Sequence, residues 1–217
     1  MPTPLKIDFV SDVACPWCAV GLAELELALA RLRATLQIDL EFQPFELNPN
    51  LAPEGQDMAE HLSQKYGASP AQLAQTSEQI RARGEALGFH FDFAKRTRIY
   101  NTFDAHRLLY WTKEDRELQR TLKWALLKAY FTQGKDVSQQ QILHEVAVDC
   151  GVNPTDVDAV LYSTRYTHEV QEREAFYRQR GIQAVPSVII GERHLIQGAQ
   201  SHTVYEQALR RIAEAED

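Results

Sequence analysis

The sequence is poor in cysteine: its 217 residues include three, Cys15, Cys18 and Cys150. A structural zinc site commonly takes its four ligands from two close pairs, and this chain has one close cysteine pair only. Its histidines are scattered without the paired spacing of metal ligands. A disulfide across two intervening residues would close so short a loop that it constrains almost nothing. The composition therefore predicts no metal site and disfavours a purely structural role for the pair.

Positive charge and long apolar runs are also scarce. The net charge of -7 disfavours nucleic acid and anionic membranes as partners, because both bind basic surfaces. No apolar run approaches the length of a transmembrane helix. The first strand is predicted within a few residues of Met1, which leaves no room for a signal peptide. We therefore expect a cytoplasmic protein, in a compartment where a close cysteine pair is catalytic or metal-binding rather than structural.

The close cysteine pair falls between two regular patterns. Residues 5–10 alternate apolar and polar side chains, which is typical of a half-buried strand. After the pair, leucines recur at steps of three and four over residues 22–36, as in an amphipathic helix. Pro16 suits the first turn of that helix, where no N–H group is missed. The pair therefore lies where a strand ends and a helix begins.

This junction predicts different roles for the two thiols. A helix N-terminus carries unpaired N–H groups and partial positive charge, and both stabilise a thiolate at Cys15. Cys18 lies one turn further along the same face, within reach of a disulfide bond to Cys15. We predict that Cys15 is the exposed nucleophile. Cys18 is then the more buried thiol, which resolves a mixed disulfide formed at Cys15.

Strand patterns recur near both ends of the chain. Residues 37–45 alternate again and predict a second strand, parallel to the first across the intervening helix. Residues 48–57 have the composition of a loop. A hairpin is predicted over residues 187–196, followed by a last helix over residues 202–215 with Val204 on its inner side.

Between these strands, residues 57–180 are almost wholly helical in pattern. Ser69 is predicted to cap one helix, and Ser138 with Gln141 fits a capping box at the start of another. Cys150 falls on the apolar face of that second helix, so we expect a buried, inert thiol there. A helical bundle over one side of the sheet accounts for this stretch.

The segment Asp12-Val13-Ala14-Cys15-Pro16-Trp17-Cys18 resembles the active-site segment of the DsbA-like branch of the thioredoxin superfamily, in particular the FrnE-like group. Residues 42–49, 101–107 and 185–187 extend the resemblance, in order, through most of the chain. The resemblance implies an α/β fold, a thioredoxin fold of β-α-β and β-β-α units interrupted by a large helical insertion.

The same resemblance implies a division of the chain. Residues 1–50 would form the N-terminal part of the thioredoxin fold and residues 181–217 its C-terminal part. Residues 51–180 would form the helical insertion domain. Periodicity predicts the individual elements, whereas the resemblance implies how they assemble.

Four residues are implied as the substrate-binding set. Thioredoxin-like folds have a cis-proline that faces the active-site cysteines, and Pro186 occupies that position. The preceding Val185 would present its backbone to an extended substrate segment. Pro16 and Trp17 lie between the cysteines. Their dipeptide lacks the cationic histidine of strongly oxidising relatives, which predicts a less oxidising couple.

Further polar residues have less definite roles. Asn101, Asp104 and His106 belong to a segment that the resemblance brings towards the active-site groove, although a helix-surface pair is equally consistent with the pattern. Asp12 and Glu46 are candidate proton acceptors for the resolving thiol, a role that burial-shifted carboxylates can play.

The sequence thus favours a thiol–disulfide oxidoreductase with no bound cofactor and no metal. Its expected partner is a disulfide-containing protein or a small-molecule thiol, with glutathione as a candidate reductant or co-substrate. The alternative is a glutathione-dependent isomerase or transferase similar to 2-hydroxychromene-2-carboxylate isomerase, a group that commonly has serine where this chain has Cys15. A binding module with incidental cysteines is a third interpretation. The substrate, reduction potential, oligomeric state and any lid movement stay open.

Overall fold

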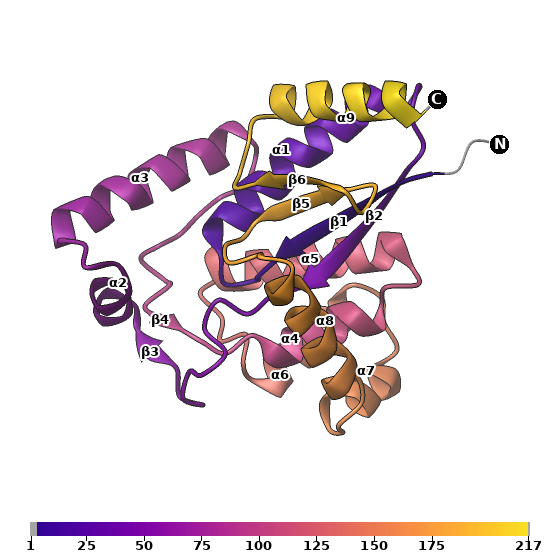
Figure 1. The fold of residues 1–217 in the computed structure, drawn as a ribbon. Helices are drawn as coiled ribbons and strands as arrows, with labels where there is room; N and C mark the ends of the chain where they lie inside the picture. Colours follow the sequence, from indigo (N-terminus) through magenta and orange to yellow (C-terminus); the bar gives the residue numbers. More distant parts are fainter. Residues whose placement is uncertain (1–3, 217) are drawn as a thin grey trace.

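The computed structural model describes residues 4–216 and arranges helices around a central sheet (Figure 1). The strands are β1 (Leu5–Ser11), β2 (Ile38–Pro44), β3 (Gln56–Asp57), β4 (Arg98–Ile99), β5 (Ser187–Ile190) and β6 (His194–Gln197). The helices are α1 (Pro16–Leu32), α2 (Met58–Tyr66), α3 (Pro70–Ala86), α4 (Phe103–Trp111), α5 (Arg116–Phe131), α6 (Gln140–Asp149), α7 (Pro154–Leu161), α8 (Thr167–Gln179) and α9 (His202–Glu216).

The main sheet has the strand order β2-β1-β5-β6. Strand β2 runs parallel to β1, while β5 is antiparallel to both β1 and β6. Phe9 in β1 lies opposite Phe42 on one side and Val188 on the other. The order confirms the predicted α/β thioredoxin fold with helices inserted between β2 and β5. The boundaries drawn at residues 1–50, 51–180 and 181–217 stay a prediction.

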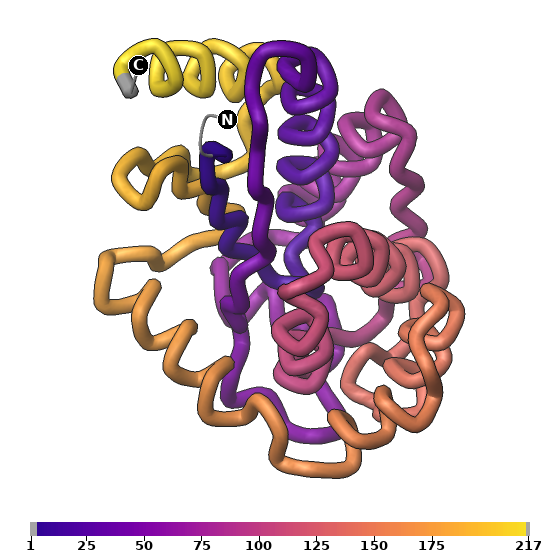
Figure 2. Tube along the Cα trace, turned by 90° about the vertical axis from the view of Figure 1, so that its right-hand side faces the viewer, coloured from indigo at the N-terminus to yellow at the C-terminus, as the bar shows by residue number. Residues whose placement is uncertain are grey.

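Helices cover the sheet from different parts of the chain. Helix α9 packs along α1, and α3 also contacts α1. Helices α4, α5 and α8 contact β2 instead. Figure 1 and Figure 2 both show residues 101–180 gathered at one end of the molecule, with α9 at the opposite end. Helix α1, which begins directly after Cys15, therefore packs against helices from both the inserted segment and the C-terminus.

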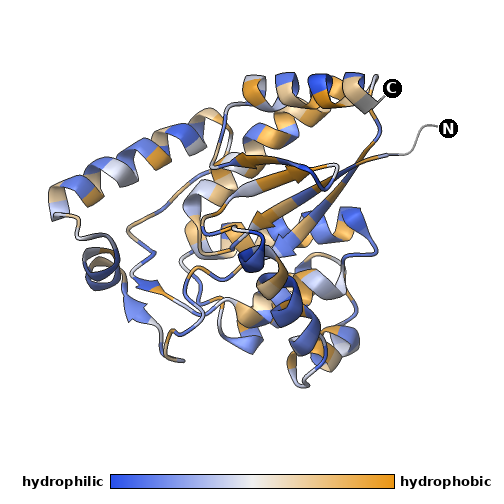
Figure 3. Ribbon diagram, viewed as in Figure 1, coloured by the Kyte–Doolittle hydropathy of each residue, from blue (hydrophilic) through white to orange (hydrophobic). Residues whose placement is uncertain are grey.

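Strand β1 is buried on both faces, contrary to the predicted half-buried strand. Its residues from Ile7 to Ser11 are all buried, because β2 and β5 flank the strand and helices cover it. The polar residue Asp8 is accommodated by a hydrogen bond from Gln43 Nε2 at 2.7 Å. Figure 3 shows the central strands coloured largely as hydrophobic, in contrast to the mixed outer helices.

A side chain from the inserted helices covers the edge strand β2. The Gln119 amide oxygen accepts a hydrogen bond from the Phe42 N–H at 3.1 Å. Its Nε2 donates to the Phe42 carbonyl at 3.2 Å and to the Leu109 carbonyl at 2.9 Å. The buried glutamine thus takes the place of a further strand at an edge whose backbone groups would otherwise lack partners.

The start of α3 was predicted correctly, whereas the start of α6 was not. Ser69 caps α3 and forms a capping box with Gln72, as its position indicated. The capping box at Ser138 is wrong, because the N-cap position of α6 is Gln139, whose side chain makes no capping hydrogen bond. The Ser138 hydroxyl instead donates a hydrogen bond to Asp136 Oδ1 at 2.6 Å. The side chain therefore stabilises the turn before the helix rather than the helix N-terminus.

Two other local predictions are corrected. Val204 is 42% exposed rather than on the inner side of α9, because Tyr205 and Leu209 occupy the buried face. The predicted loop at residues 48–57 ends in the short strand β3, which pairs with β4. A two-residue strand has too short a pattern to be recognised from sequence.

Candidate active site

The two close cysteines lie at the start of α1, directly after β1. Cys15 is the N-cap residue with an extended backbone, and Pro16 occupies the first helical turn. The Cys18 N–H donates to the Cys15 carbonyl at 3.0 Å, and both side chains are free thiols. The predicted strand-to-helix junction is confirmed. Orphan N–H groups at this helix end are suited to stabilising an anion.

The Cys15 thiol is more enclosed than expected. Cys18 is fully buried, as predicted, but Cys15 is 4% exposed and not the exposed residue that we expected. Val185 is one of the buried residues that cluster with Cys15, and its carbonyl lies 3.5 Å from Cys15 Sγ and accepts its hydrogen bond. Burial raises the pKa of the Cys18 thiol well above its usual range, and the neighbouring Cys15 adds to this effect.

The proline loop packs closely on α1. The Val185–Pro186 peptide bond is cis, as the resemblance implies. A Cβ atom at Gly21 would lie 2.9 Å from Pro186 Cγ, too close for an undisturbed contact. The glycine in α1 therefore allows Pro186 to approach the helix that carries both cysteines.

A cavity of about 990 Å³ lies beside Cys15. Its lining includes Pro16, Trp17 and Val185 from the predicted substrate-binding set, whereas Pro186 packs against α1 instead. The remaining apolar lining comes from Ala14, Phe45, Leu47, Pro49, Met58, Leu62, Tyr66, Ala68, Leu73, Ile80, Phe93, Ile99, Ile182 and Ala184. The polar lining comes from Glu46, Asn48, His61, Lys65, Thr76, Ser77, Arg96, Arg178 and Gln183.

Asp12 is a buried carboxylate held by backbone donors. Its Oδ2 accepts the Leu47 N–H at 2.8 Å and its Oδ1 accepts the Ala14 N–H at 3.2 Å. His106 Nε2 lies 3.4 Å from the same Oδ1. Burial raises the pKa of Asp12, but His106 and the two N–H groups outweigh burial and hold it below its usual range. Asp12 is therefore a weak base that fixes two loops near the cysteines.

Glu46 has the opposite electrostatic environment. Burial raises its pKa to about 7, and the charges of Glu174 and Asp12 add to the effect against the opposing charge of His106. Its carboxylate accepts a hydrogen bond from Asn101 Nδ2 at 2.9 Å. Because Glu46 lines the cavity and titrates near neutral pH, it is the better placed of the two predicted proton acceptors.

Lys123 on α5 is a site residue that the sequence did not indicate. The side chain is fully buried, and its ammonium has no hydrogen-bond partner among residues 4–216. Burial lowers its pKa, while the charges of Cys18, Asp12 and Cys15 oppose that shift. Lys123 in turn opposes the rise in the Cys18 pKa. In sequence it is one lysine in an amphipathic helix, which carries no signal of this position.

The segment of residues 101–107 divides between two environments. Asn101 and His106 reach Glu46 and Asp12 near the cysteines, as described above. Asp104 instead accepts a hydrogen bond from Arg107 Nη1 at 2.8 Å. The other Arg107 donors bind backbone carbonyls at residues 160, 163 and 165 and so tie α4 to the end of α7. Asp104 is therefore a structural partner rather than part of the site.

The remaining predictions concern metals, membranes and the third cysteine. Within residues 4–216, no group of three or more histidine, cysteine, aspartate or glutamate side chains is arranged to hold a metal ion. None of the helices in this range is long and apolar enough to cross a membrane. Cys150 is half-buried at the end of α6 rather than fully buried, and burial raises the pKa of its thiol.

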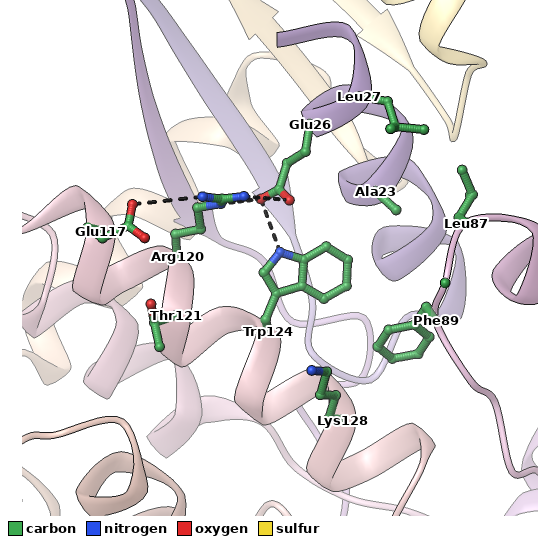
Figure 4. A pocket seen from close by; sticks show the side chains of 11 residues that line it. Ala23, Glu26, Leu27, Leu87, Phe89, Glu117, Arg120, Thr121, Trp124 and Lys128 are labelled. Atoms are coloured by element: carbon green, nitrogen blue, oxygen red, sulfur yellow. Dashed lines mark hydrogen bonds and ion pairs between the residues drawn. The ribbon is translucent and has the colours of Figure 1, made fainter. Parts of the chain in front are cut away.

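A second cavity, of about 570 Å³, lies between α1 and α5 and contains no cysteine (Figure 4). Its charged groups bind one another: Arg120 donates to Glu26 through Nε at 2.6 Å and Nη2 at 3.0 Å. The Trp124 indole also donates to Glu26, at 3.0 Å, and Glu117 lies 3.8 Å from Arg120. The arginine and both glutamates of this cavity are thus engaged with one another.

Comparison with known proteins agrees with this arrangement. The sequence matches the DSBA-like thioredoxin domain family over residues 6–210. It is similar to the probable DsbA oxidoreductase SCO1869 from Streptomyces coelicolor, with 32% identity and a TM-score of 0.87. That alignment covers 95% of this chain and 89% of the Streptomyces chain.

More distant structures share the fold. A 2-hydroxychromene-2-carboxylate isomerase has 14% identity and a TM-score of 0.71, with 97% of each chain covered. The cytosolic disulfide reductase DsbM from Pseudomonas aeruginosa, solved with GSH, has 13% identity and a TM-score of 0.61, with 98% of each chain covered. At these identities the likeness concerns the fold alone.

Proposed function

This chain belongs to the DSBA-like thioredoxin domain family, and we propose that it is a thiol–disulfide oxidoreductase with Cys15 as nucleophile and Cys18 as resolving thiol. The observation that carries the proposal is the environment of Cys15. Cys15 is the N-cap residue of α1, borders a large cavity and has its thiol 3.5 Å from the Val185 carbonyl. A thiolate at this position is stabilised by the dipole of α1, and the adjacent cavity has space for a substrate.

The reaction proceeds by two exchanges. The Cys15 thiolate attacks one sulfur of a substrate disulfide, so that a mixed disulfide forms and the other substrate sulfur leaves as a thiolate. The Cys18 thiolate then attacks Cys15 Sγ and releases the second substrate sulfur. The substrate disulfide gains two electrons, and the enzyme dithiol becomes a disulfide. An external dithiol, or two molecules of a monothiol, restores the reduced enzyme.

The second exchange requires a proton to leave Cys18. Burial opposes this step by raising the Cys18 pKa, and Lys123 favours it because its positive charge stabilises the thiolate. We therefore assign Lys123 as a positioning residue for resolution. Glu46, whose pKa is about 7, exchanges protons between the cavity and solvent. In these roles the two residues act on charge and do not contact the disulfide.

The substrate-binding set in this proposal is Pro16, Trp17, Val185 and Pro186. Val185 has its carbonyl beside the nucleophile, which suits pairing with an extended substrate backbone. The enzyme requires no bound cofactor, and glutathione or a protein dithiol serves as reductant. A cytoplasmic location fits a fold neighbour that is described as a cytosolic disulfide reductase. In that compartment the dithiol would be the resting form, so that reduction or isomerisation of substrates is favoured.

A glutathione-dependent isomerase or transferase is the second candidate function. The specific observation in its favour is the size of the cavity beside Cys15, which is sufficient for a small organic substrate. The fold is also similar to that of 2-hydroxychromene-2-carboxylate isomerase. In this reaction glutathione would supply the reacting thiol, and the second cysteine would have no role.

The deciding experiment is glutathione-dependent reduction of insulin by the native protein and its Cys15→Ser variant. We expect turnover by the native protein and a fall to the uncatalysed rate in the variant, because serine forms no mixed disulfide. The matched control is Cys150→Ser, which removes a half-buried thiol away from the site and should leave turnover unchanged. Absence of turnover in the native protein, or full turnover in Cys15→Ser, contradicts the proposal. The first of these results would favour the isomerase.

A further inference from the structure

We propose that the cavity beside Cys15 binds a small apolar disulfide or thiol that carries a carboxylate, and that Arg96 is the residue that binds this carboxylate. The inference rests on the proposed function, because it names the substrate class of the same site. Arg96 lies in the segment between α3 and β4, and nothing in its sequence context indicated it.

Arg96 is a cation without an anionic partner. It lines the cavity, yet its Nε is buried with no hydrogen-bond partner. Its Nη2 contacts the Met58 sulfur at 3.5 Å, and no oxygen acceptor for the guanidinium exists among residues 4–216. Guanidinium groups removed from water are normally paired with carboxylates or phosphates. The cavity therefore has a strong donor whose acceptor must come from outside the chain.

Aromatic rings hold this guanidinium in place. Its central carbon lies 4.8 Å from the ring centre of Phe93, 5.2 Å from that of Phe131 and 5.7 Å from that of Tyr130. These faces stabilise the cation but offer no oxygen acceptor to its N–H donors, of which one reaches only the Met58 sulfur. A rigid fork without an oxygen acceptor suits the planar, two-oxygen geometry of a carboxylate.

The other charged side chains of the cavity are engaged. Lys65 donates to Asn48 Oδ1 at 2.6 Å and to a backbone carbonyl at 3.0 Å. Arg178 donates to Glu174 at 3.3 Å and to the Glu46 carbonyl at 3.1 Å. The single acidic residue of the lining is Glu46, whose pKa of about 7 leaves it partly neutral. A chain of net charge -7 thus lines this cavity with an excess of cations, which attract an anion.

The shape and lining limit the rest of the ligand. A volume of about 990 Å³ is at the upper end of the range for small-molecule sites. Leu73, Ile80 and Phe93 contribute apolar wall between helix α3 and the Arg96 segment, so the body of the ligand is apolar. The ligand is fixed at two points, by its sulfur at Cys15 and by its carboxylate at Arg96. A neutral apolar disulfide would leave Arg96 unpaired and lose that contribution.

The chemistry at Cys15 is unchanged by this binding mode. The Cys15 thiolate attacks the ligand disulfide, forms the mixed disulfide with the carboxylate-bearing half and releases the other half as a thiolate. Cys18 then displaces the bound half, so that two electrons pass from the enzyme dithiol to the ligand. Arg96 contributes by holding the carboxylate and does not exchange a proton.

The test compares two aromatic disulfides of similar size, dithiobis(nitrobenzoate), which carries carboxylates, and the uncharged dithiodipyridine. The second-order rate of thiolate release by reduced protein is measured in a Cys150→Ser background, so that the active-site pair alone reports. In Arg96→Met we expect the rate with the carboxylate disulfide to fall about 10- to 100-fold, the effect of losing a charged hydrogen bond. The rate with dithiodipyridine should change little.

The matched control is Arg120→Met, which removes an arginine from the second cavity and should alter neither rate. Arg96→Lys, which keeps the charge but not the fork, should lose part of the preference. Equal loss with both disulfides, or no loss with either, overturns the Arg96 site while the oxidoreductase stands. Failure of the parent protein to react with either disulfide would instead contradict the proposed function.

A second measurement needs no Arg96 variant and so does not depend on how well that variant folds. Phenylpropionate and its neutral amide are compared as protectants of Cys15 against alkylation by iodoacetamide in the parent protein. We expect protection by the carboxylate and weak or no protection by the amide. Equal protection by both probes would show an apolar cavity without a carboxylate site and overturn the proposal. If peptides with an acidic residue beside cysteine protect Cys15 better than phenylpropionate does, the cavity binds protein substrates rather than a small molecule. That result would also overturn the proposal.

Discussion

The two cavities of this protein differ in whether their arginine is paired with an acidic side chain. In the cavity between α1 and α5, Arg120 and Glu26 form a two-point ion pair, and Trp124 completes the coordination of the carboxylate. In the cavity beside Cys15, Arg96 has ring faces but no acid, and Glu46 is bound by the neutral amide of Asn101. In the first cavity the arginine and the glutamate neutralise each other. In the second cavity the arginine has no acidic partner, so that a ligand can pair with it.

This difference explains why cavity formation alone does not identify a site. Both cavities are lined by apolar and charged side chains, and both lie beside α1. Where charges satisfy one another, a ligand gains little by displacing water. Where a buried cation and a proton-exchanging carboxyl remain unmatched beside a thiol, their free energy cost is retained in the native state. Such a cost is expected at functional sites.

The largest predicted effect concerns Lys123, which lies on α5 one turn from Arg120. Lys123→Met should raise the free energy of unfolding by about 1–3 kcal/mol, because it removes a buried ammonium that has no partner. The same change should slow release of the mixed disulfide and shift its pH profile to higher pH, because Lys123 stabilises the Cys18 thiolate. Urea unfolding and single-turnover kinetics measure the two effects.

The control for this variant is Lys128→Met on the same helix, where the side chain is exposed. It should leave both stability and resolution nearly unchanged. If Lys123→Met destabilises the protein and leaves the pH profile of resolution unmoved, the lysine is a structural residue and its assigned role is wrong.

The next effect concerns the carboxyl of the active-site cavity. The pKa of Glu46 is raised from 4.5 to about 7, so its stabilising contribution is complete below pH 4.5 and is lost as the pH rises through about 7. Relative to Glu46→Gln, the parent protein should lose about 3 kcal/mol of unfolding free energy between pH 4.5 and pH 8. Denaturant unfolding of both proteins across this pH range measures the difference. A constant difference would show that folding does not raise the pKa of Glu46.

The smallest effect is expected in the second cavity. Glu26→Gln removes the ion pair with Arg120, whose side chain is 45% exposed. Solvent-exposed pairs contribute about 0.2–1 kcal/mol, so the unfolding free energy should fall by no more than that. Insulin reduction should be unaffected. A larger loss, or a change in activity, would remove the contrast between the two cavities.

Local patterns were sufficient for most of the elements and for the junction that carries Cys15. The alternation before Cys15 and the leucine spacing after it predicted the strand-to-helix junction, which the structure confirms. The parallel β2 strand and the β5–β6 hairpin were predicted in the same way. These features depend on residues close together in the chain, whose spacing is visible in the sequence. The prediction that β1 is half-buried was wrong, because the burial of a strand depends on the elements that cover it.

The composition of the site around the cysteines was only partly predictable. Pro186 and Val185 were implied by a resemblance, and the contact between Val185 and Cys15 spans 170 positions in the chain. Asp12 and Glu46 were equivalent as candidates until burial and neighbours set their pKa values in opposite directions. Arg96 and Lys123 had no signal, because a lysine or arginine in a polar segment or amphipathic helix is normally solvated.

The sequence by itself determined the α/β order of elements, the junction that carries Cys15 and Cys18, and the acidic character of the chain. The tertiary structure alone decided which charges are paired and which are left unmatched beside the thiols. The physical reason is that the state of a charge depends on its solvation and on neighbours in space. The neighbours of Arg96 and Lys123 come from elements that only the fold brings together.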